Sequence, residues 1–344
     1  NFAGGGYFFL DQRGRVWSAT KTNHLLVLAL DKDAKGFHVV SDYDLTRAVT
    51  GGERITSALP DFSGRIWFVT KKDGKVGVLN PRTRRIRIKR TGEEIENSFA
   101  VGRGGVFVVS DKRMYRFDAG KDGRPHVTWK VRYRNSGIHK PSQVDAGSGT
   151  TPTILAHGLV AITDNADPMN VVVYRTAKRL GRHAKRTVCT VPVFSKGRSA
   201  TENSLIGSGR SLIAENNDGY ADPFAPGVAP LTTAGIARVD LNAKRTGCHR
   251  VWTNRTARAA SVVPKLSTKT QLVYAYSQDA GATPLMRSWS WVALSARTGK
   301  TVFRVPSGDG LLANNNYAGI ALGPDGRTAY LGTIGGMRAL RAGG

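Results

Sequence analysis

Cysteine is scarce in this sequence: Cys189 and Cys248 are the two present among 344 residues. Neither shows the Cys or His spacing of a zinc site, which argues against structural zinc. Each falls in what we expect to be the outer strand of one of two consecutive repeats. A disulfide between neighbouring repeats is one interpretation and two buried thiols are the other. If it forms, the disulfide indicates an oxidising compartment outside the cytoplasm.

Long apolar runs are missing as well. No run approaches the roughly 20 residues of a membrane-spanning helix, so we expect no membrane span. The sequence does not open with a cationic leader, an apolar core and a cleavage site. We therefore expect either a mature or trimmed product or a protein that was never exported. The sequence also lacks a nucleophile elbow, a phosphate-binding glycine loop and a zinc helix motif.

Acidic residues are few, with 25 Asp and Glu against 51 Lys and Arg and a formal charge of +26. Such a charge attracts polyanions non-specifically, including nucleic acid, anionic glycans and membrane surfaces. The cations are scattered rather than gathered in long blocks, and no nucleic-acid recognition motif accompanies them. We expect no specific nucleic-acid partner. We favour a solubilising surface, or adaptation to unusual ionic conditions, as the explanation of the charge.

One pattern is repeated along the chain. In residues 201–217 a polar lead-in precedes a short apolar run, a Gly-containing turn, a second apolar run and a polar exit. This pattern is typical of a β-hairpin whose polar residues lie at its open end. The same pattern occurs at 6–20, 57–70, 97–110, 151–164, 263–276 and 316–333.

The repeats predict an all-β, seven-repeat β-propeller with four-stranded antiparallel blades, in one domain spanning residues 1–344. Repeat lengths of roughly 40 to 60 residues are typical of propeller blades. The expected blades are 5–50, 52–92, 96–132, 150–195, 201–254, 261–306 and 314–342. The seventh repeat offers three strands. We expect that closure is incomplete, or that residues absent from the amino end complete the last blade.

The stretch 293–303, Ala-Leu-Ser-Ala-Arg-Thr-Gly-Lys-Thr-Val-Phe, resembles the strand-turn-strand signature of quinoprotein-type (PQQ/YVTN) propellers. In that signature a Thr-Gly pair makes the turn and a following aromatic residue docks against the next blade. The whole chain looks like the secreted actinobacterial propellers with this quinoprotein-like fold. Their dehydrogenase relatives would add a quinone, calcium and a ring formed by adjacent cysteines, and Cys189 and Cys248 are too far apart in sequence for that ring.

Propeller geometry predicts where chemistry could lie. The loops before each innermost strand and after each second strand share one face, around the channel mouth, and the hairpin turns lie on the other. Carboxylates and amides fall on the first side, whereas the turns carry Arg beside Gly, as at Arg13, Arg65 and Arg210. Asn and Asp also cap strand ends in ordinary turns, which is the purely structural interpretation of the same residues.

Three carboxylates are the candidates for catalysis. Glu202 paired with Glu215 or Asp164 could serve as general acid and base, because a neighbouring charge raises one pKa. Oxygen-rich sites also suit calcium, for which Asp164 and Asp167 are the candidate ligands.

The remaining candidates are polar groups that suit a sugar or another polar molecule. Lys265 could bind an anion or neutralise a buried carboxylate, and His139 lies in an irregular stretch at 133–149 from which it could reach the mouth. The candidate ligand-binding residues are Asn165, Asn203, Asn216, Lys265, Asn315, Asn316, Tyr317 and His139.

These features predict a secreted propeller that binds a polar small molecule or a glycan at an acidic, Asn-rich mouth. If it is an enzyme, we expect carboxylate acid/base chemistry in a hydrolase or lyase. A non-catalytic scaffold or polyanion-binding protein is the alternative. A quinone-dependent oxidoreductase is the third interpretation.

Overall fold

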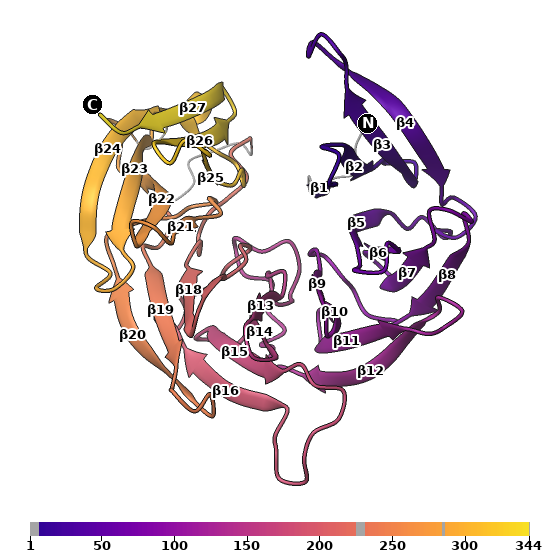
Figure 1. The fold of residues 1–344 in the computed structure, drawn as a ribbon. Coiled ribbons are helices and arrows are strands. Elements are labelled where there is room, and N and C mark those ends of the chain that lie inside the picture. Colours follow the sequence, from indigo (N-terminus) through magenta and orange to yellow (C-terminus); the bar gives the residue numbers. More distant parts are fainter. Residues whose placement is uncertain (1–6, 225–230, 284–285, 344) are drawn as a thin grey trace. The chain divides into compact units, whose positions relative to one another are not determined.

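The computed structural model of this protein describes residues 7–224, 231–283 and 286–343. β-strands supply nearly all of the regular structure in these residues (Figure 1). The one helix among them is a short 3₁₀ turn, Leu311–Ala313. The described part of the chain therefore contains no helix with the length and apolar character needed to cross a bilayer.

The chain divides into two compact units. The first unit comprises Asn1–Tyr133 and Thr176–Arg186, and the second comprises Arg134–Arg175 and Thr187–Gly344. The first unit holds three antiparallel sheets, each built from four strands that pair in chain order. Their strands are β1 (Phe8–Leu10), β2 (Val16–Ala19), β3 (His24–Leu30) and β4 (Phe37–Asp44); β5 (Ile55–Pro60), β6 (Ile66–Thr70), β7 (Lys75–Leu79) and β8 (Ile86–Arg90); and β9 (Ala100–Gly102), β10 (Gly105–Val109), β11 (Arg113–Ala119) and β12 (Pro125–Arg132).

The second unit holds four sheets of the same kind, the last with three strands among the described residues. Their strands are β13 (Thr153–Leu155), β14 (Leu159–Thr163), β15 (Asn170–Arg175) and β16 (Thr187–Pro192); β17 (Ile206–Ser208), β18 (Ser211–Glu215), β19 (Ile236–Leu241) and β20 (Cys248–Asn254); β21 (Lys265–Ser267), β22 (Leu272–Asp279), β23 (Ser288–Ser295) and β24 (Thr301–Asp309); and β25 (Ala321–Leu322), β26 (Thr328–Thr333) and β27 (Gly336–Arg341).

The predicted fold class is confirmed: the protein is all-β and is a propeller of seven blades. The seven sheets follow the order of the expected repeats, and β24 of the sixth runs to Asp309, past the expected end at residue 306. The seventh sheet, β25–β27, has the three strands that the sequence offered. The organisation as a single domain and the way in which the last blade is completed stay predictions.

Burial explains why the middle strands were the easiest to recognise. All five residues of β6, β7 and β14 are buried, because these strands are covered on both faces. Such strands have continuous apolar runs rather than an alternating pattern. The outer strands are half exposed, as in β16, and they alternate less regularly.

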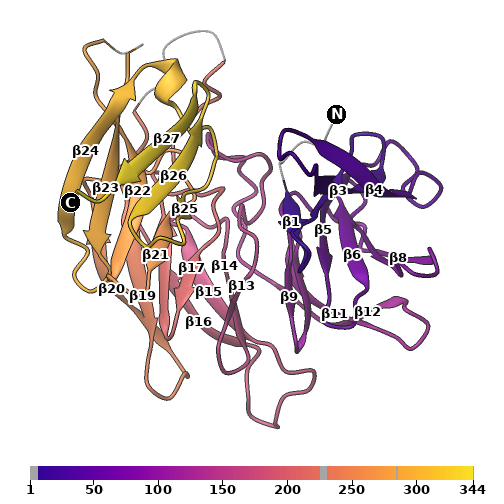
Figure 2. The ribbon, with the colours of Figure 1, turned by 45° about the horizontal axis from the view of Figure 1, so that its top comes forward.

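Apolar cores fill the space between successive blades within each unit. In the first unit, Trp17 and Phe68 belong to one cluster and Trp67 and Phe117 to the next. In the second unit the largest cluster contains Trp289 and joins the fifth, sixth and seventh blades. Figure 2 shows the strands of each unit running side by side. Burial of these clusters is the main force that holds neighbouring blades together.

The hairpin turns of the first two blades share one arrangement. The Asp61 carboxylate accepts hydrogen bonds from the main-chain amides of Ser63 and Arg65 and from the Trp67 indole. Asp11 binds the amides of its own turn and the Trp17 indole in the same way. Although burial opposes it, this bonding lowers the pKa of the Asp61 carboxyl. The turn aspartates therefore fasten each hairpin end to the core tryptophan behind it.

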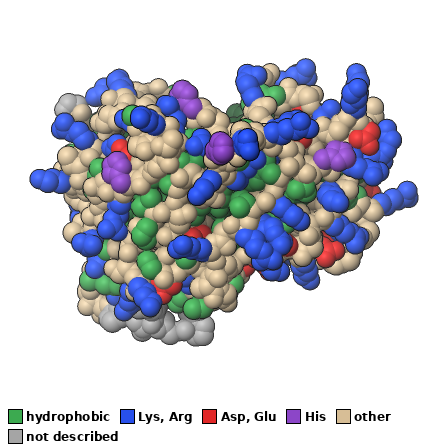
Figure 3. Space-filling model, turned by 90° about the horizontal axis from the view of Figure 1, so that it is seen from below, with side chains coloured by type: hydrophobic (Ala, Val, Ile, Leu, Met, Phe, Trp, Pro, Cys, Tyr) green, Lys and Arg blue, Asp and Glu red, His purple; other side chains and the backbone are tan. Residues whose placement is uncertain are grey.

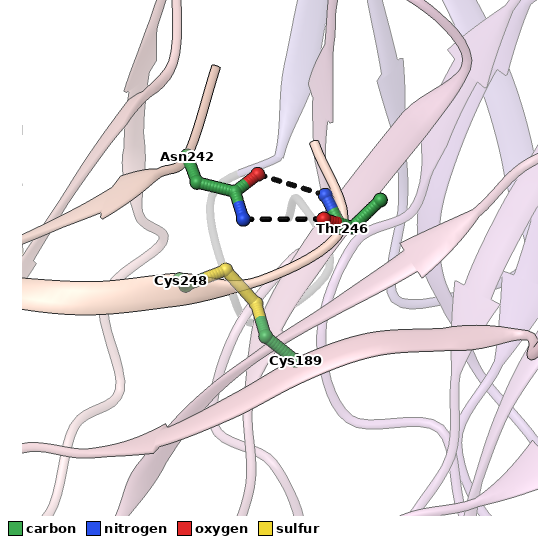
Figure 4. Close-up of a disulfide and its surroundings, with 4 residues drawn as sticks. All are labelled: Cys189, Asn242, Thr246 and Cys248. Atoms are coloured by element: carbon green, nitrogen blue, oxygen red, sulfur yellow. Dashed lines mark hydrogen bonds between the residues drawn. A yellow bond between two sulfur atoms is a disulfide. The ribbon is translucent and has the colours of Figure 1, made fainter. Parts of the chain in front are cut away.

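Cys189 and Cys248 form a disulfide, as one of the two interpretations predicted. The bond joins β16 of the fourth blade to β20 of the fifth, with Cα atoms 5.7 Å apart (Figure 4). Beside it, the Asn242 side chain binds the amide and the hydroxyl of Thr246, and this closes the β19–β20 turn. The disulfide thus links the outer edges of two successive blades of the second unit.

The Thr-Gly turn of the sixth blade is a docking point for the blade before it. Gly299 adopts a φ of +71°. The Trp252 ring lies so close to Gly299 that a Cβ atom there would overlap it. The Trp252 indole donates to the Ala296 carbonyl over 3.0 Å. Glycine is required here both by the left-handed backbone and by the ring.

Candidate functional site

The polar residues of the fifth blade converge on the Glu215 carboxyl group. Glu215 is the last residue of β18, and Thr201 and Asn203 lie in the segment that precedes β17. The Asn203 side-chain amide donates to Glu215 Oε1 over 2.5 Å, and the Thr201 hydroxyl donates to the same oxygen over 3.2 Å. Asn203 also donates to the Val262 carbonyl. The pattern places these residues together because they occupy the open end of one hairpin.

Burial favours the neutral form of the Glu215 carboxyl group. Its side chain is 2% exposed, and burial raises its pKa to about 8, against the smaller opposing effect of Asn203 and Thr201. Its Oε2 atom is buried and has no hydrogen-bond partner in the part of the chain that the structure describes. A protonated carboxyl group carries one O–H donor, so this oxygen can give a proton or a hydrogen bond.

Glu93 in the first unit shows what a charged partner changes. This buried carboxylate is paired with Arg113 and accepts hydrogen bonds from the Ser110 hydroxyl at 2.5 Å and the Tyr115 hydroxyl at 2.7 Å. Glu215 has an amide and a hydroxyl as partners instead, and no Lys, Arg or His in the described residues forms an ion pair with it. The two residues therefore differ in kind: Glu93 belongs to a structural ion pair, whereas Glu215 has no cationic partner among the described residues.

Two tyrosines form a pair, of which Tyr317 is an electrostatic neighbour of Glu202 and Glu215. The rings of Tyr220 and Tyr317 meet edge to face, with centroids 5.5 Å apart. The Tyr220 hydroxyl binds the side-chain oxygens of Asn314 and Asn316, at 3.1 and 3.3 Å. Burial is the main cause that raises the pKa of the Tyr317 phenol. The nearby groups Glu202, Tyr220 and Glu215 raise this pKa further, so they are electrostatic neighbours of Tyr317. Tyr317 is nevertheless 37% exposed, and this gives the cluster an aromatic face toward solvent.

A long loop, residues 134–149, borders the same cluster. The Tyr317 hydroxyl donates to the Ser142 carbonyl over 3.2 Å, and the Val144 amide donates to Glu202 Oε1 over 3.2 Å. Gly149 has a φ of +69°, and a Cβ atom there would overlap the Thr201 carbonyl. The loop therefore contacts both ends of the cluster, next to Glu202 and next to Tyr317.

Asn165 and Lys140 hold this loop in place. The Asn165 side-chain amide donates to the Asn135 side chain and to the carbonyls of Ile138 and Ala146. The Lys140 ammonium donates to the Ala166 carbonyl at 2.6 Å and to the Ser199 carbonyl at 2.9 Å. Burial lowers the pKa of Lys140, and three aspartates oppose that effect. His139 is bonded within the loop to the Gln143 carbonyl.

The carboxylate proposed to assist, Asp164, is occupied by its own turn. It is 1% exposed and accepts from the main chain and the side chain of Asn170, both at 2.8 Å, and from the Ala166 amide. Burial raises its pKa. Asp167 accepts from the Gly197 amide at 2.6 Å. Within the described residues no three His, Cys, Asp or Glu side chains group to hold a metal ion, and calcium at Asp164 and Asp167 stays a prediction.

The other predicted residues have three different surroundings. Asn216 has a structural role, because it bonds the Arg198 carbonyl and the amides of Ala200 and Asp218. Asn315 bonds Ser261 and Ala318 next to the tyrosines, and Asn316 contacts Tyr220. Lys265 begins β21 with an exposed side chain that forms no hydrogen bond or ion pair with the described residues.

Sequence reasoning missed two contributions. The first is the main chain of Ser142 and Val144, for which the irregular stretch at 133–149 was the available signal. The second is Thr201, the first residue of the repeating pattern. Asn217 is a further polar residue of this region: it is 0% exposed, and neither its side-chain oxygen nor its nitrogen has a hydrogen-bond partner among the described residues. Buried amides are rarely left without partners, so Asn217 is a candidate contact for a bound molecule.

Comparison with known proteins supports the fold and leaves the activity open. No family model matches the chain. An uncharacterized protein from Archaeoglobus fulgidus is 28% identical over 328 residues, covering 85% of this chain and 62% of that protein. The chain thus spans less than two thirds of that relative's length.

Solved structures resemble the chain over nearly its whole length. Virginiamycin B lyase from Staphylococcus aureus has a TM-score of 0.53 and 12% identity, covering 96% of this chain and 92% of that chain. Kluyveromyces lactis Hsv2 has a TM-score of 0.54 and 11% identity, with 95% and 89% covered. Chaetomium thermophilum Sqt1, solved bound to the N-terminus of ribosomal protein L10, has a TM-score of 0.57 and 13% identity, covering 97% of this chain and 82% of that chain. The shared feature is the β-propeller fold.

Proposed function

We propose that the cluster around Glu215 binds a small polar molecule or the end of a glycan, and that Glu215 acts there as a general acid. The observation that carries this proposal is a carboxyl group that is protonated at neutral pH and has one oxygen without a partner. Polar groups that converge beside an aromatic face are what a hydroxyl-rich ligand requires. Tyr317 provides that face.

The proposed chemistry uses two carboxyl groups in opposite protonation states. In a hydrolysis, the bond between carbon and the leaving oxygen breaks as Glu215 gives its proton to that oxygen. Glu202, as a carboxylate, takes a proton from the water whose oxygen bonds to the carbon. In an elimination, Glu202 takes the proton from carbon instead. We assign Asp164 no proton transfer, because Asn170 and Ala166 occupy its oxygens.

The test compares turnover with binding on a panel of polysaccharides and oligosaccharides. Glu215→Gln keeps a neutral side chain with a donor, so we expect binding to persist while turnover falls by a factor on the order of 10² to 10⁴. Glu202→Gln should lower turnover as well. Glu94→Gln in the first unit is the matched control, since Glu94 is a partly exposed carboxylate near Lys71. Unchanged turnover and binding in both site variants would remove the assignment.

A polyanion-binding scaffold is the second candidate, and the charge of +26 favours it. Lys and Arg side chains are spread over the face in Figure 3 and greatly outnumber Asp and Glu there. This candidate predicts heparin binding that weakens steeply with salt and ignores Glu202→Gln and Glu215→Gln. The disulfide supports an extracellular location for either function, because such bonds persist in oxidising compartments.

A further inference from the structure

A groove in the second unit lies far along the chain from Glu215. It is a groove of about 450 Å³ between the sixth and seventh blades, a size within the range of small-molecule sites. It opens where the β21–β22 and β25–β26 turns come together. The residues that line it are Ser267, Lys269, Thr270, Tyr274, Phe303, Val305, Leu322, Gly323, Gly326, Arg327, Thr328, Ala329, Leu340, Arg341 and Ala342.

The floor of the groove is apolar. Phe303 and Val305 come from β24, and the Tyr274 ring meets Phe303 with centroids 6.2 Å apart. Leu322 and Leu340 line it from the seventh blade. Val305 and Leu322 are each 39% exposed, so an apolar surface of aromatic and aliphatic side chains is accessible. Such a surface gains free energy when an alkyl chain covers it.

The rim of the groove is cationic. Lys269, Arg327 and Arg341 line it, and no Asp or Glu is among the described residues that line it. Their side chains form no ion pair or hydrogen bond with other described residues. Asp325 lies in the same turn as Arg327; it accepts from the amides of Arg327 and Thr328, and Arg341 helps to lower its pKa. Even with the negative charge of Asp325 counted, the three cations leave the rim with a net positive charge.

The shape of the groove distinguishes a small molecule from an added strand. The seventh sheet leaves one edge of β27 without a neighbour in the described residues. An extended peptide pairing with that edge would run along all of β27. However, only Leu340 and Arg341 of β27 line the groove, together with Ala342. The hollow is therefore confined to the end of the strand, where the three cations lie.

We propose that this groove binds a straight-chain alkyl carboxylate, with its chain on Phe303 and Val305 and its carboxylate among Lys269, Arg327 and Arg341. Arginine suits a carboxylate because its planar guanidinium donates two parallel hydrogen bonds. The hydroxyls of Ser267 and Thr270 line the groove close to Lys269 and add polar contacts for the head group. This proposal is independent of the role of Glu215.

Titration calorimetry on the whole chain tests it with dodecanoate, dodecanol and dodecyltrimethylammonium as probes. We expect one dodecanoate per chain, with dodecanol and the cation binding at least about tenfold more weakly. Arg327→Ala combined with Arg341→Ala should lower the affinity for dodecanoate by about tenfold or more, whereas Val305→Glu should abolish dodecanoate binding. Arg210→Ala, in the equivalent turn of the fifth blade, is the control and should bind normally.

Three results would overturn the proposal. Equal affinity for dodecanol and dodecanoate would show that the cations select nothing. Unchanged dodecanoate binding by the double arginine variant would place the ligand elsewhere. Binding of many dodecanoate molecules per chain would indicate adsorption to the cationic surface. A thermal unfolding curve for each variant confirms folding, and Leu322→Glu replaces Val305→Glu if the latter does not fold.

Discussion

Arg238 and Trp252 donate to the same acceptor, the main-chain carbonyl of Ala296 in the next blade, over 2.8 and 3.0 Å. Arg238 is itself held by Asp240 through two hydrogen bonds of 2.7 Å. The first unit repeats the arrangement with Arg116, which is paired with Asp118, and with Trp129, both of which donate to the Thr176 carbonyl. In the second unit this fastens the fifth blade to the sixth, and in the first unit it fastens the third blade to the segment 176–186.

Arg238→Met should destabilise the protein by about 2 kcal/mol, because it removes the bond to Ala296 and leaves Asp240 without its cation. The pair is only about one-fifth exposed, so solvent screens it weakly. Chemical unfolding measures the loss. Arg210→Met, at an exposed turn, should change stability little, and an equal effect in both variants would contradict the interpretation of Arg238 as a tie between blades.

Glu215 should make stability depend on pH above the acid range. Its pKa is about 8 in the folded chain and near 4.5 when unfolded, so the folded state holds the proton more tightly. The resulting stabilisation is present in full below pH 4.5 and is lost as the pH rises through 8. Relative to Glu215→Gln, the parent protein should therefore lose stability between pH 5 and 9, and its free energy of unfolding should fall by an amount on the order of a few kcal/mol. Parallel unfolding curves for the two proteins would show that Glu215 titrates normally.

The disulfide should contribute about 4 kcal/mol, given its separation of 59 residues. Replacing both Cys189 and Cys248 with Ala should lower the free energy of unfolding by that amount. A reducing agent should lower the stability of the parent protein to that of the double variant and leave the stability of the double variant unchanged. If the reductant affects both proteins equally, its action does not pass through this bond.

The sequence predicted the blades because each hairpin combines apolar strands with a Gly turn. It also placed Glu215 and Asn203 together, since both lie at the open end of the β17–β18 hairpin. It could not predict that Ser142 and Val144 reach the same site, because the loop that carries them has no periodic pattern. Nor does a strand-end position determine where a side chain points: Asn165 was expected to bind a ligand and instead bonds the loop.

Asn165→Leu should free the 134–149 loop without unfolding the blades. Asn165 is 0% exposed, and its amide supplies hydrogen bonds to three loop acceptors, which an isosteric leucine cannot make. Each lost bond costs about 1 kcal/mol, so local opening of the loop should become roughly 10- to 100-fold more frequent. Hydrogen exchange should show faster exchange at 134–149 and little change in β14 and β18. Asn242→Leu, at the exposed β19–β20 turn, should leave the loop unaffected.

Unchanged exchange in Asn165→Leu would show that other contacts, such as those of Lys140, suffice to hold the loop. Because the loop borders Glu202 and Tyr317, we also expect the proposed ligand to bind more weakly to Asn165→Leu.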